Sequence, residues 1–96
     1  MEQPWWKAPL AEFVGTFTLI FIGAGSIIAA TAAQVGGAGL VGIALAHGIA
    51  LGVMVSATGH ISGGHINPAV TIAFLSAGRL SAKRALEYIV AQLFGA

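Results

Sequence analysis

The sequence predicts an all-α membrane protein, and three features lead to this fold class. Of the 96 residues, 57% are hydrophobic and only 7% are charged, whereas about a quarter of the residues in a soluble domain are charged. Residues 13–33 and residues 38–58 carry no charge at all. Residues 69–77 are also apolar but too few to cross a bilayer, and they follow a glycine-rich polar turn. Together these features predict two spanning helices and one half-length helix.

The first 33 residues divide into a polar lead-in, residues 1–9, and a first transmembrane helix, residues 10–33. Trp5 and Trp6 in the lead-in suit the headgroup layer of a membrane. The uncharged part of the helix would be about 31 Å long, which is enough to cross a hydrocarbon core of about 30 Å. A cleavable signal peptide is the competing interpretation, because a lysine, an apolar run and several small residues imitate one. The length of the run and Glu12 at its start favour the span.

A short turn at residues 34–37 leads to a second transmembrane helix, residues 38–59, with His47 near its middle. Small residues recur at four-residue intervals on one face of this helix, namely Ala44, Gly48, Gly52 and Ser56. Such a stripe lets another helix approach closely. Glycine is also common in membrane helices for no such reason, so both interpretations stay open.

Residues 60–79 predict a loop that re-enters the membrane and contains a half-helix from residue 67. Asn67 is a favoured N-cap residue, and Pro68 suits the first helical position because its missing N–H is not needed there. The apolar segment that follows covers only half of the hydrocarbon core. Non-helical backbone is tolerated at that depth only where protein buries it or where it lines a watery cavity. The polar turn therefore indicates a path through the membrane.

Residues 81–96 predict the start of a third transmembrane helix that is cut short, with Ser81 as its N-cap. The segment is apolar but too short to span, and we expect the chain to be a fragment. Positive residues orient the helices, because Lys7 precedes the first span while Arg79, Lys83 and Arg84 follow the half-helix. Positive charge favours the cytoplasmic side. We expect a multi-pass protein of the cell membrane with a cytoplasmic N-terminus.

Composition argues against several function classes. A net charge of +1 gives no basic patch for nucleic acid, and the sequence has no cysteine for disulfides or thiolate chemistry. No nucleophile stands beside a base, and no pair of carboxylates is spaced for acid–base catalysis, so we expect no enzyme. His60 and His65 are five residues apart, whereas a helical pair of metal ligands is spaced by three or four. We expect neither a metal nor a cofactor.

Three segments carry a resemblance to the aquaporin (major intrinsic protein) family: residues 11–16 (AEFVGT), 60–71 (HISGGHINPAVT) and 84–92 (RALEYIVAQ). The resemblance implies a fold of six transmembrane helices and two re-entrant half-helices, built as an inverted repeat and assembled as a tetramer. This chain would be the first repeat. The implied function is a passive channel for water and other small neutral solutes that excludes protons and ions.

The half-helix start is the candidate path. A helix N-terminus carries about half a positive charge, and the amide of Asn67 offers N–H donors to a passing water. The resemblance places Asn67, Pro68 and Ala69 in the pore. It also implies that the backbone carbonyls of the turn, Gly63, Gly64, His65 and Ile66, form a ladder of acceptors. The alternatives are that Asn67 is only a helix cap and that the turn is an ordinary flexible one.

His47 is a second candidate, because an ionisable group in the middle of a span is costly. It matches the place where the family's narrow filter takes its second-helix residue, often Phe in water-selective members and Trp in glycerol facilitators. Histidine departs from both and resembles some vacuolar plant members, which pass water and in some cases ammonia. A neutral imidazole would leave a slightly wider and more polar path than phenylalanine. The alternative is a histidine that bonds a neighbouring helix.

Glu12 and Gln92 complete the candidate residues. A carboxylate in a low dielectric must find donors or become protonated. The resemblance implies that Glu12 braces the re-entrant loop, together with His65, and that Gln92 does the same from the third helix. A glutamate that snorkels toward the headgroups is the plainer interpretation. Other function classes stay open: a glycerol or ammonia facilitator, a secondary transporter, and a membrane protein with a purely structural role.

Overall fold

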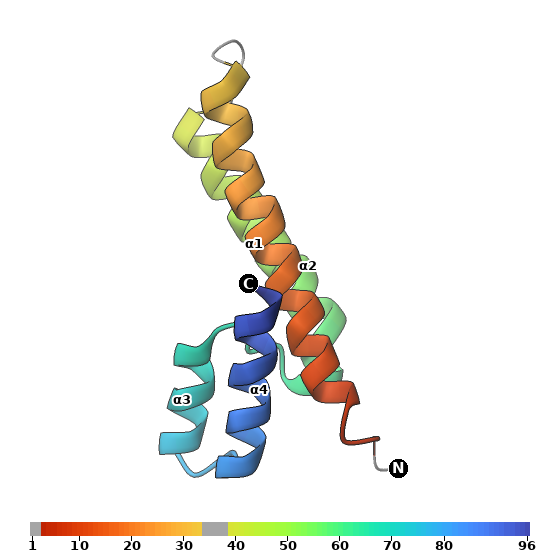
Figure 1. Ribbon diagram of the computed structural model, residues 1–96. Helices are drawn as coiled ribbons and strands as arrows, with labels where there is room; N and C mark the ends of the chain where they lie inside the picture. Colours follow the sequence, from red (N-terminus) through yellow and green to blue (C-terminus); the bar gives the residue numbers. More distant parts are fainter. Residues whose placement is uncertain (1–2, 34–38) are drawn as a thin grey trace.

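The computed structural model describes residues 3–33 and 39–96, and in these two ranges the chain forms four helices. They are α1 (Lys7–Ala33), α2 (Gly39–Ser62), α3 (Pro68–Ser76) and α4 (Ala82–Gly95). The long helices α1 and α2 lie side by side and run in opposite directions (Figure 1). The shorter α3 and α4 form a second antiparallel pair, and α4 packs against the first half of α1 (Figure 1).

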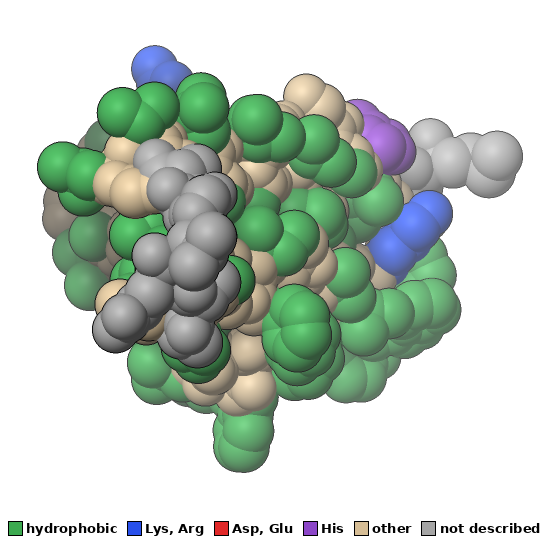
Figure 2. Space-filling view, turned by 90° about the horizontal axis from the view of Figure 1, so that it is seen from above, with side chains coloured by type: hydrophobic (Ala, Val, Ile, Leu, Met, Phe, Trp, Pro, Cys, Tyr) green, Lys and Arg blue, Asp and Glu red, His purple; other side chains and the backbone are tan. Residues whose placement is uncertain are grey.

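Helices α1 and α2 are both long and apolar enough to cross a membrane. Many of their large apolar side chains face outward, including Phe21, Ile28 and Leu40, which are 69%, 66% and 82% exposed. Seen from above, hydrophobic side chains make up most of the visible surface, and the few charged ones lie at its edge (Figure 2). A soluble monomer rarely exposes so much contiguous apolar surface. The surface suits contact with lipid or with further helices.

The helix bounds differ from the predicted ones by a few residues. Helix α1 begins at Lys7 rather than at residue 10, because Pro9 falls in the first turn, where its missing N–H is not needed. Helix α2 continues to Ser62 rather than ending at residue 59, and it stops where Gly63 takes a φ of +91°. The predicted turn at residues 34–37 and the predicted start of the second span at residue 38 lie outside the described residues. The stripe from Ala44 to Ser56 lies on the exposed side of α2.

Helix α3 follows the local rules at its start. Asn67 has an extended backbone (φ −153°), and its Oδ1 accepts from the N–H of Ala69 at 2.8 Å, so it is the N-cap and Pro68 is the first helical residue. With nine residues, α3 is about 14 Å long. It begins at mid-height in Figure 1 and runs toward the end where α2 finishes. Ser81 caps α4 by accepting from the N–H of Arg84 at 3.2 Å.

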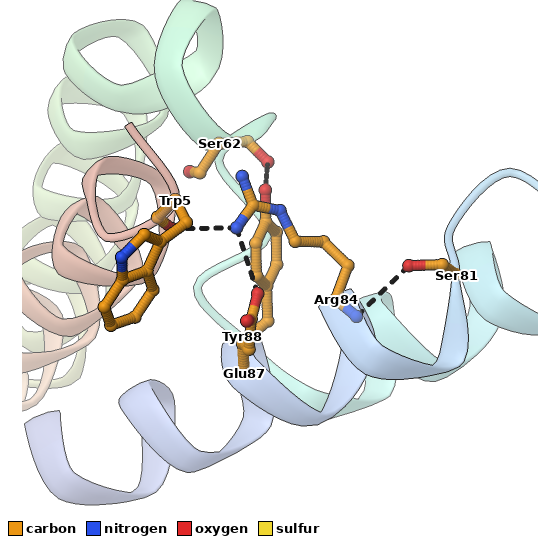
Figure 3. A network of polar contacts seen from close by, with 6 residues as sticks. All are labelled: Trp5, Ser62, Ser81, Arg84, Glu87 and Tyr88. Atoms are coloured by element: carbon orange, nitrogen blue, oxygen red, sulfur yellow. Dashed lines mark hydrogen bonds and ion pairs between the residues drawn. The ribbon is translucent and has the colours of Figure 1, made fainter. Parts of the chain in front are cut away.

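Trp5, in the segment just before α1, is tied to α4. The guanidinium of Arg84 donates from Nη1 to the carbonyl oxygen of Trp5 at 2.9 Å and to Oε1 of Glu87 at 3.0 Å (Figure 3). It also lies 5.8 Å from the centroid of the Tyr88 ring. The Tyr88 hydroxyl donates in turn to the carbonyl oxygen of Ser62 at 2.8 Å (Figure 3). One turn of α4 therefore holds both Trp5 and the end of α2.

Helices α4 and α1 come into close backbone contact at Gly95. A Cβ on this residue would lie 2.5 Å from the carbonyl oxygen of Phe13 and 3.2 Å from the backbone nitrogen of Phe17. Real Cβ atoms do not come this close to backbone, so a side chain here would push the two helices apart. The missing side chain thus sets the distance between α1 and α4.

We therefore expect Gly95→Ala to lower the free energy of unfolding by about 1–3 kcal/mol, as overpacking does in a tight core. The matched control is Gly52→Ala on α2, where a Cβ would meet no atom within 4 Å. Alanine there should be neutral or stabilising, because glycine costs about 0.5–1 kcal/mol in a helix interior. Thermal unfolding of both variants in detergent measures the difference. Equal melting temperatures would contradict this account of the α1–α4 contact.

Candidate functional site

A fully buried carboxylate, that of Glu12, lies at the centre of the molecule's polar interior. Its Oε2 accepts from the Ser62 hydroxyl at 2.6 Å and from the backbone N–H of His65 at 3.1 Å. Its Oε1 accepts from the backbone N–H of Ile66 at 2.8 Å and from Nε2 of Gln92 at 2.6 Å. A carboxylate can be buried only if donors replace its hydration, and these four do so.

Gln92 and Thr71 extend this network into α3 and α4. Both are buried, and Nε2 of Gln92 donates to Oγ1 of Thr71 at 3.0 Å as well as to Glu12. The same Thr71 oxygen lies 2.9 Å from Nδ1 of His65. The amide of Gln92 must present its NH₂ group here, because the reverse orientation would set its oxygen against the carboxylate. One network therefore joins α1, α3, α4 and the turn before α3.

The backbone of that turn, residues 63–66, is in unusual conformations. Gly63 and Gly64 have φ values of +91° and +64°, and Ile66 has φ +59°, the one positive value at a non-glycine residue in the described ranges. A β-branched residue rarely adopts this region, and it persists only where its surroundings impose it. Two contacts impose this conformation on Ile66: its N–H donates to Glu12, and its side chain packs against Gly15.

The carbonyl oxygens of the turn are largely unused. Those of Gly63, Gly64 and His65 accept no hydrogen bond from any residue in the described ranges, and that of Ile66 has only a long contact, 3.4 Å, with Oγ1 of Thr16. All four N–H groups of the turn are bonded within the chain, whereas the carbonyl oxygens of Gly63, Gly64 and His65 have no partner in the described ranges.

Asn67 stands at the end of this run of carbonyls. Its side chain is exposed, and its Oδ1 is occupied by the N–H of Ala69. The Nδ2 group has no acceptor within the described parts of the chain. Pro68 is half-buried and Ala69 is exposed beside it. The cap therefore fixes the orientation of the amide and leaves its two N–H donors available at the positive end of α3.

The side chain of His65 is not among these available groups, because its Nδ1 lies 2.9 Å from Oγ1 of Thr71. Its imidazole is buried, stacks on Phe74 at a centroid distance of 4.7 Å and meets the edge of Tyr88 at 5.1 Å. It belongs to the packing between α3 and α4. His65 contributes to the turn through its backbone. Its N–H donates to Glu12, and its carbonyl oxygen is unpaired in the described ranges.

His47 is not brought together with the turn. It lies about 22 Å along α2 from Ser62, the last residue of that helix. Its ring is half-buried, and Nδ1 lies 2.8 Å from the carbonyl oxygen of Ile43 in its own helix. On the α1 side the ring lies against Gly23. His47 and the turn are thus two separate candidate sites.

Sequence reasoning missed Ser62, Thr71 and Tyr88. Two weak signals were present, because Ser62 adjoins the glycine pair and Thr71 lies one helical turn after Asn67, on the same face. Tyr88 gave no such signal. As for metals, within the described residues there is no group of three or more His, Cys, Asp or Glu side chains that could hold an ion.

Comparison with known proteins gives a consistent result. The family described as Major intrinsic protein matches residues 1–96. The lens fiber major intrinsic protein of Gallus gallus is 50% identical over 99% of this chain and 35% of its own length. The probable aquaporin TIP3-2 of Arabidopsis thaliana is 52% identical over 94% of this chain and 37% of its own. Aquaporin Z of Photorhabdus laumondii is 48% identical over 88% of this chain and 37% of its own.

The chain spans little more than a third of the length of these curated relatives. The match nevertheless extends over all the residues of this chain, including both long apolar helices and the polar network. Because the family model matches residues 1–96 and the relatives share about half of the aligned residues, the chain belongs to the major intrinsic protein family. The members of this family are integral membrane channels and not enzymes.

Proposed function

We propose that this chain forms part of the wall of a passive path for water and other small neutral solutes, and that the path excludes protons and ions. The observation that carries the proposal is the turn at residues 63–66. The N–H groups of His65 and Ile66 are bound by the buried Glu12, and the unpaired carbonyls of the turn lead to the Nδ2 group of Asn67. That two of the relatives described above are named as aquaporins supports the same function.

The chemistry of this arrangement suits water. A water molecule can donate to the carbonyls of the turn and accept from Nδ2 of Asn67, so that bonds lost with its hydration are replaced. When its oxygen faces Asn67, both of its hydrogens point away, and a chain of waters oriented in this way cannot relay protons through that point. The positive end of α3 also repels cations. A neutral solute with hydroxyl or amine groups would use the same contacts.

The architecture that we propose is the family's six transmembrane helices and two half-helices, assembled as a tetramer. In it this chain is the first repeat, and residues 60–79 dip into the membrane from the side where α2 ends. The start of α1 and the connection between α3 and α4 lie at the same end of the molecule (Figure 1). Lys7, Arg79, Lys83 and Arg84 belong to these segments, which favours a cytoplasmic N-terminus in the cell membrane.

His47 favours a second solute. An imidazole is smaller and more polar than the phenylalanine or tryptophan side chains expected at this place, so the path beside it would be wider and could offer a hydrogen bond. Ammonia is a neutral solute of nearly the size of water that suits such a position. Glycerol would need still more width.

The test is permeability in proteoliposomes made with the complete gene product that contains these 96 residues. We expect the vesicles to shrink several-fold faster than empty ones under an osmotic gradient, with no added proton leak. Uptake of ammonia, hydrogen peroxide and glycerol is measured in parallel. If neither water nor any of these solutes crosses faster than in empty vesicles, the proposal is wrong. Flux that follows a proton or sodium gradient would instead indicate a secondary transporter.

A further inference from the structure

Gly23 in α1 and His47 in α2 meet at the contact between the two long helices. A Cβ on Gly23 would lie 2.5 Å from Nε2, 2.8 Å from Cδ2 and 3.1 Å from Cε1 of the imidazole. All three distances are shorter than ordinary van der Waals contact, so the ring occupies the space that a side chain at position 23 would need. Gly23 is buried, and the imidazole is what covers it on this side.

A hydrogen bond at the other ring nitrogen, Nδ1, holds the imidazole in this position. Nδ1 lies 2.8 Å from the carbonyl oxygen of Ile43, and a carbonyl can only accept, so Nδ1 carries the proton. In the neutral imidazole Nε2 is then unprotonated, and this is the atom that lies closest to Gly23. The hydrogen bond fixes one edge of the ring to α2, and the glycine lets the opposite edge rest against α1.

We propose that Gly23 is a positioning residue that sets the width of the path at His47, by giving the imidazole a place against α1. The proposal rests on the function proposed above. The atoms that a Cβ would meet are at the far end of a flexible side chain, not in the backbone of α2. A side chain at position 23 would therefore turn the ring away from α1 without moving the helices. Because His47 is only half-buried, the ring has open space on its other side.

The experiment compares Gly23→Ala with Gly25→Ala in the complete gene product. Position 25 is in the same helix, but a Cβ there would meet no atom within 4 Å, so it controls for the added methyl group. The measured quantity is the permeability of the largest solute that the wild type passes, divided by that of water. This ratio does not depend on how many channels fold. If the wild type passes only water, the measured quantity is instead the water permeability per reconstituted protein molecule.

We expect Gly23→Ala to lower this quantity about tenfold, the lower end of what one methylene changes in a tight site. Gly25→Ala should leave it unchanged. In a His47→Ala background the ring is absent, so adding Gly23→Ala should have no further effect, which a double-mutant cycle measures. A second readout is the ¹⁵N spectrum of labelled histidine, in which Gly23→Ala should remove the signature of the Nδ1–H bond to Ile43.

Two results would overturn the role of Gly23. One is a Gly23→Ala protein whose permeability ratio and histidine spectrum equal those of the wild type. The other is an equal effect of Gly23→Ala with and without the imidazole, which would mean that the methyl group acts through something other than His47. A wild type that conducts nothing would overturn the proposed function and the width role with it, whereas the histidine spectrum would still decide whether Gly23 positions the ring.

Discussion

Glu12→Ala should abolish the water permeability and lower the free energy of unfolding by about 3–5 kcal/mol. The substitution leaves the backbone N–H groups of His65 and Ile66 buried without an acceptor, and it also removes a partner from Ser62 and Gln92. An orphaned buried donor costs about 1–3 kcal/mol. With its restraint gone, Ile66 can leave the strained left-handed conformation, and the carbonyls of the turn then lose their common orientation.

Glu12→Gln keeps the size and shape of the side chain but removes its charge and one of its acceptor oxygens. One side-chain oxygen remains and can still accept from Ile66 and Gln92, but an NH₂ group replaces Oε2. The Ser62 hydroxyl can rotate to accept from it, whereas the His65 N–H cannot. We therefore expect one unsatisfied donor, with stability and permeability between those of the wild type and the alanine variant.

The matched control is Glu87→Ala. Glu87 is the glutamate of α4, its side chain is 24% exposed, and its ion pair with Arg84 is of the partly exposed kind that contributes about 0–1 kcal/mol. Thermal unfolding in detergent and vesicle shrinkage measure all three variants. A Glu12→Ala protein that conducts water like the Glu87→Ala protein would show that the carboxylate does not hold the turn in its working form.

Asn67→Asp should lower water permeability at least about tenfold while changing stability little. Aspartate is as good an N-cap as asparagine, so the bond from the Ala69 N–H remains. What is lost is the pair of N–H donors on Nδ2, and a tenfold loss corresponds to about 1.4 kcal/mol, the net value of one hydrogen bond. The carboxylate also offsets the positive end of α3, so the barrier to cations should fall.

Two measurements test this prediction, the osmotic shrinkage of proteoliposomes and the leak of sodium and protons into them. Ser81→Ala is the control for capping, because Ser81 caps α4 and lies far from the turn in sequence. It should cost about 1 kcal/mol of stability and leave permeability unchanged. Unchanged permeability in Asn67→Asp would mean that Asn67 serves only as a cap, and a purely structural role for the protein would then be favoured.

The helices and their caps followed from the sequence because the physics behind them is local. A span needs only enough consecutive apolar residues, and a cap needs a side chain within a few residues of the N–H that it binds. Residues 13–33 and the pair Asn67-Pro68 carry that information without reference to the rest of the chain. The same holds for the end of α3, where Gly78 takes a φ of +76°.

The functions of Glu12, Gln92 and His47 were expected from a resemblance, but their partners were decided by the tertiary structure. Glu12 accepts hydrogen bonds from His65, Ile66 and Gln92, which are 53, 54 and 80 positions away in the sequence. No local rule predicts which N–H groups these will be. The positive φ of Ile66 opposes its own preference and depends on those same contacts. The contact between the His47 ring and Gly23 forms only when α1 packs against α2. Local sequence thus determined the elements, while long-range packing decided which polar groups are bound and which are left free.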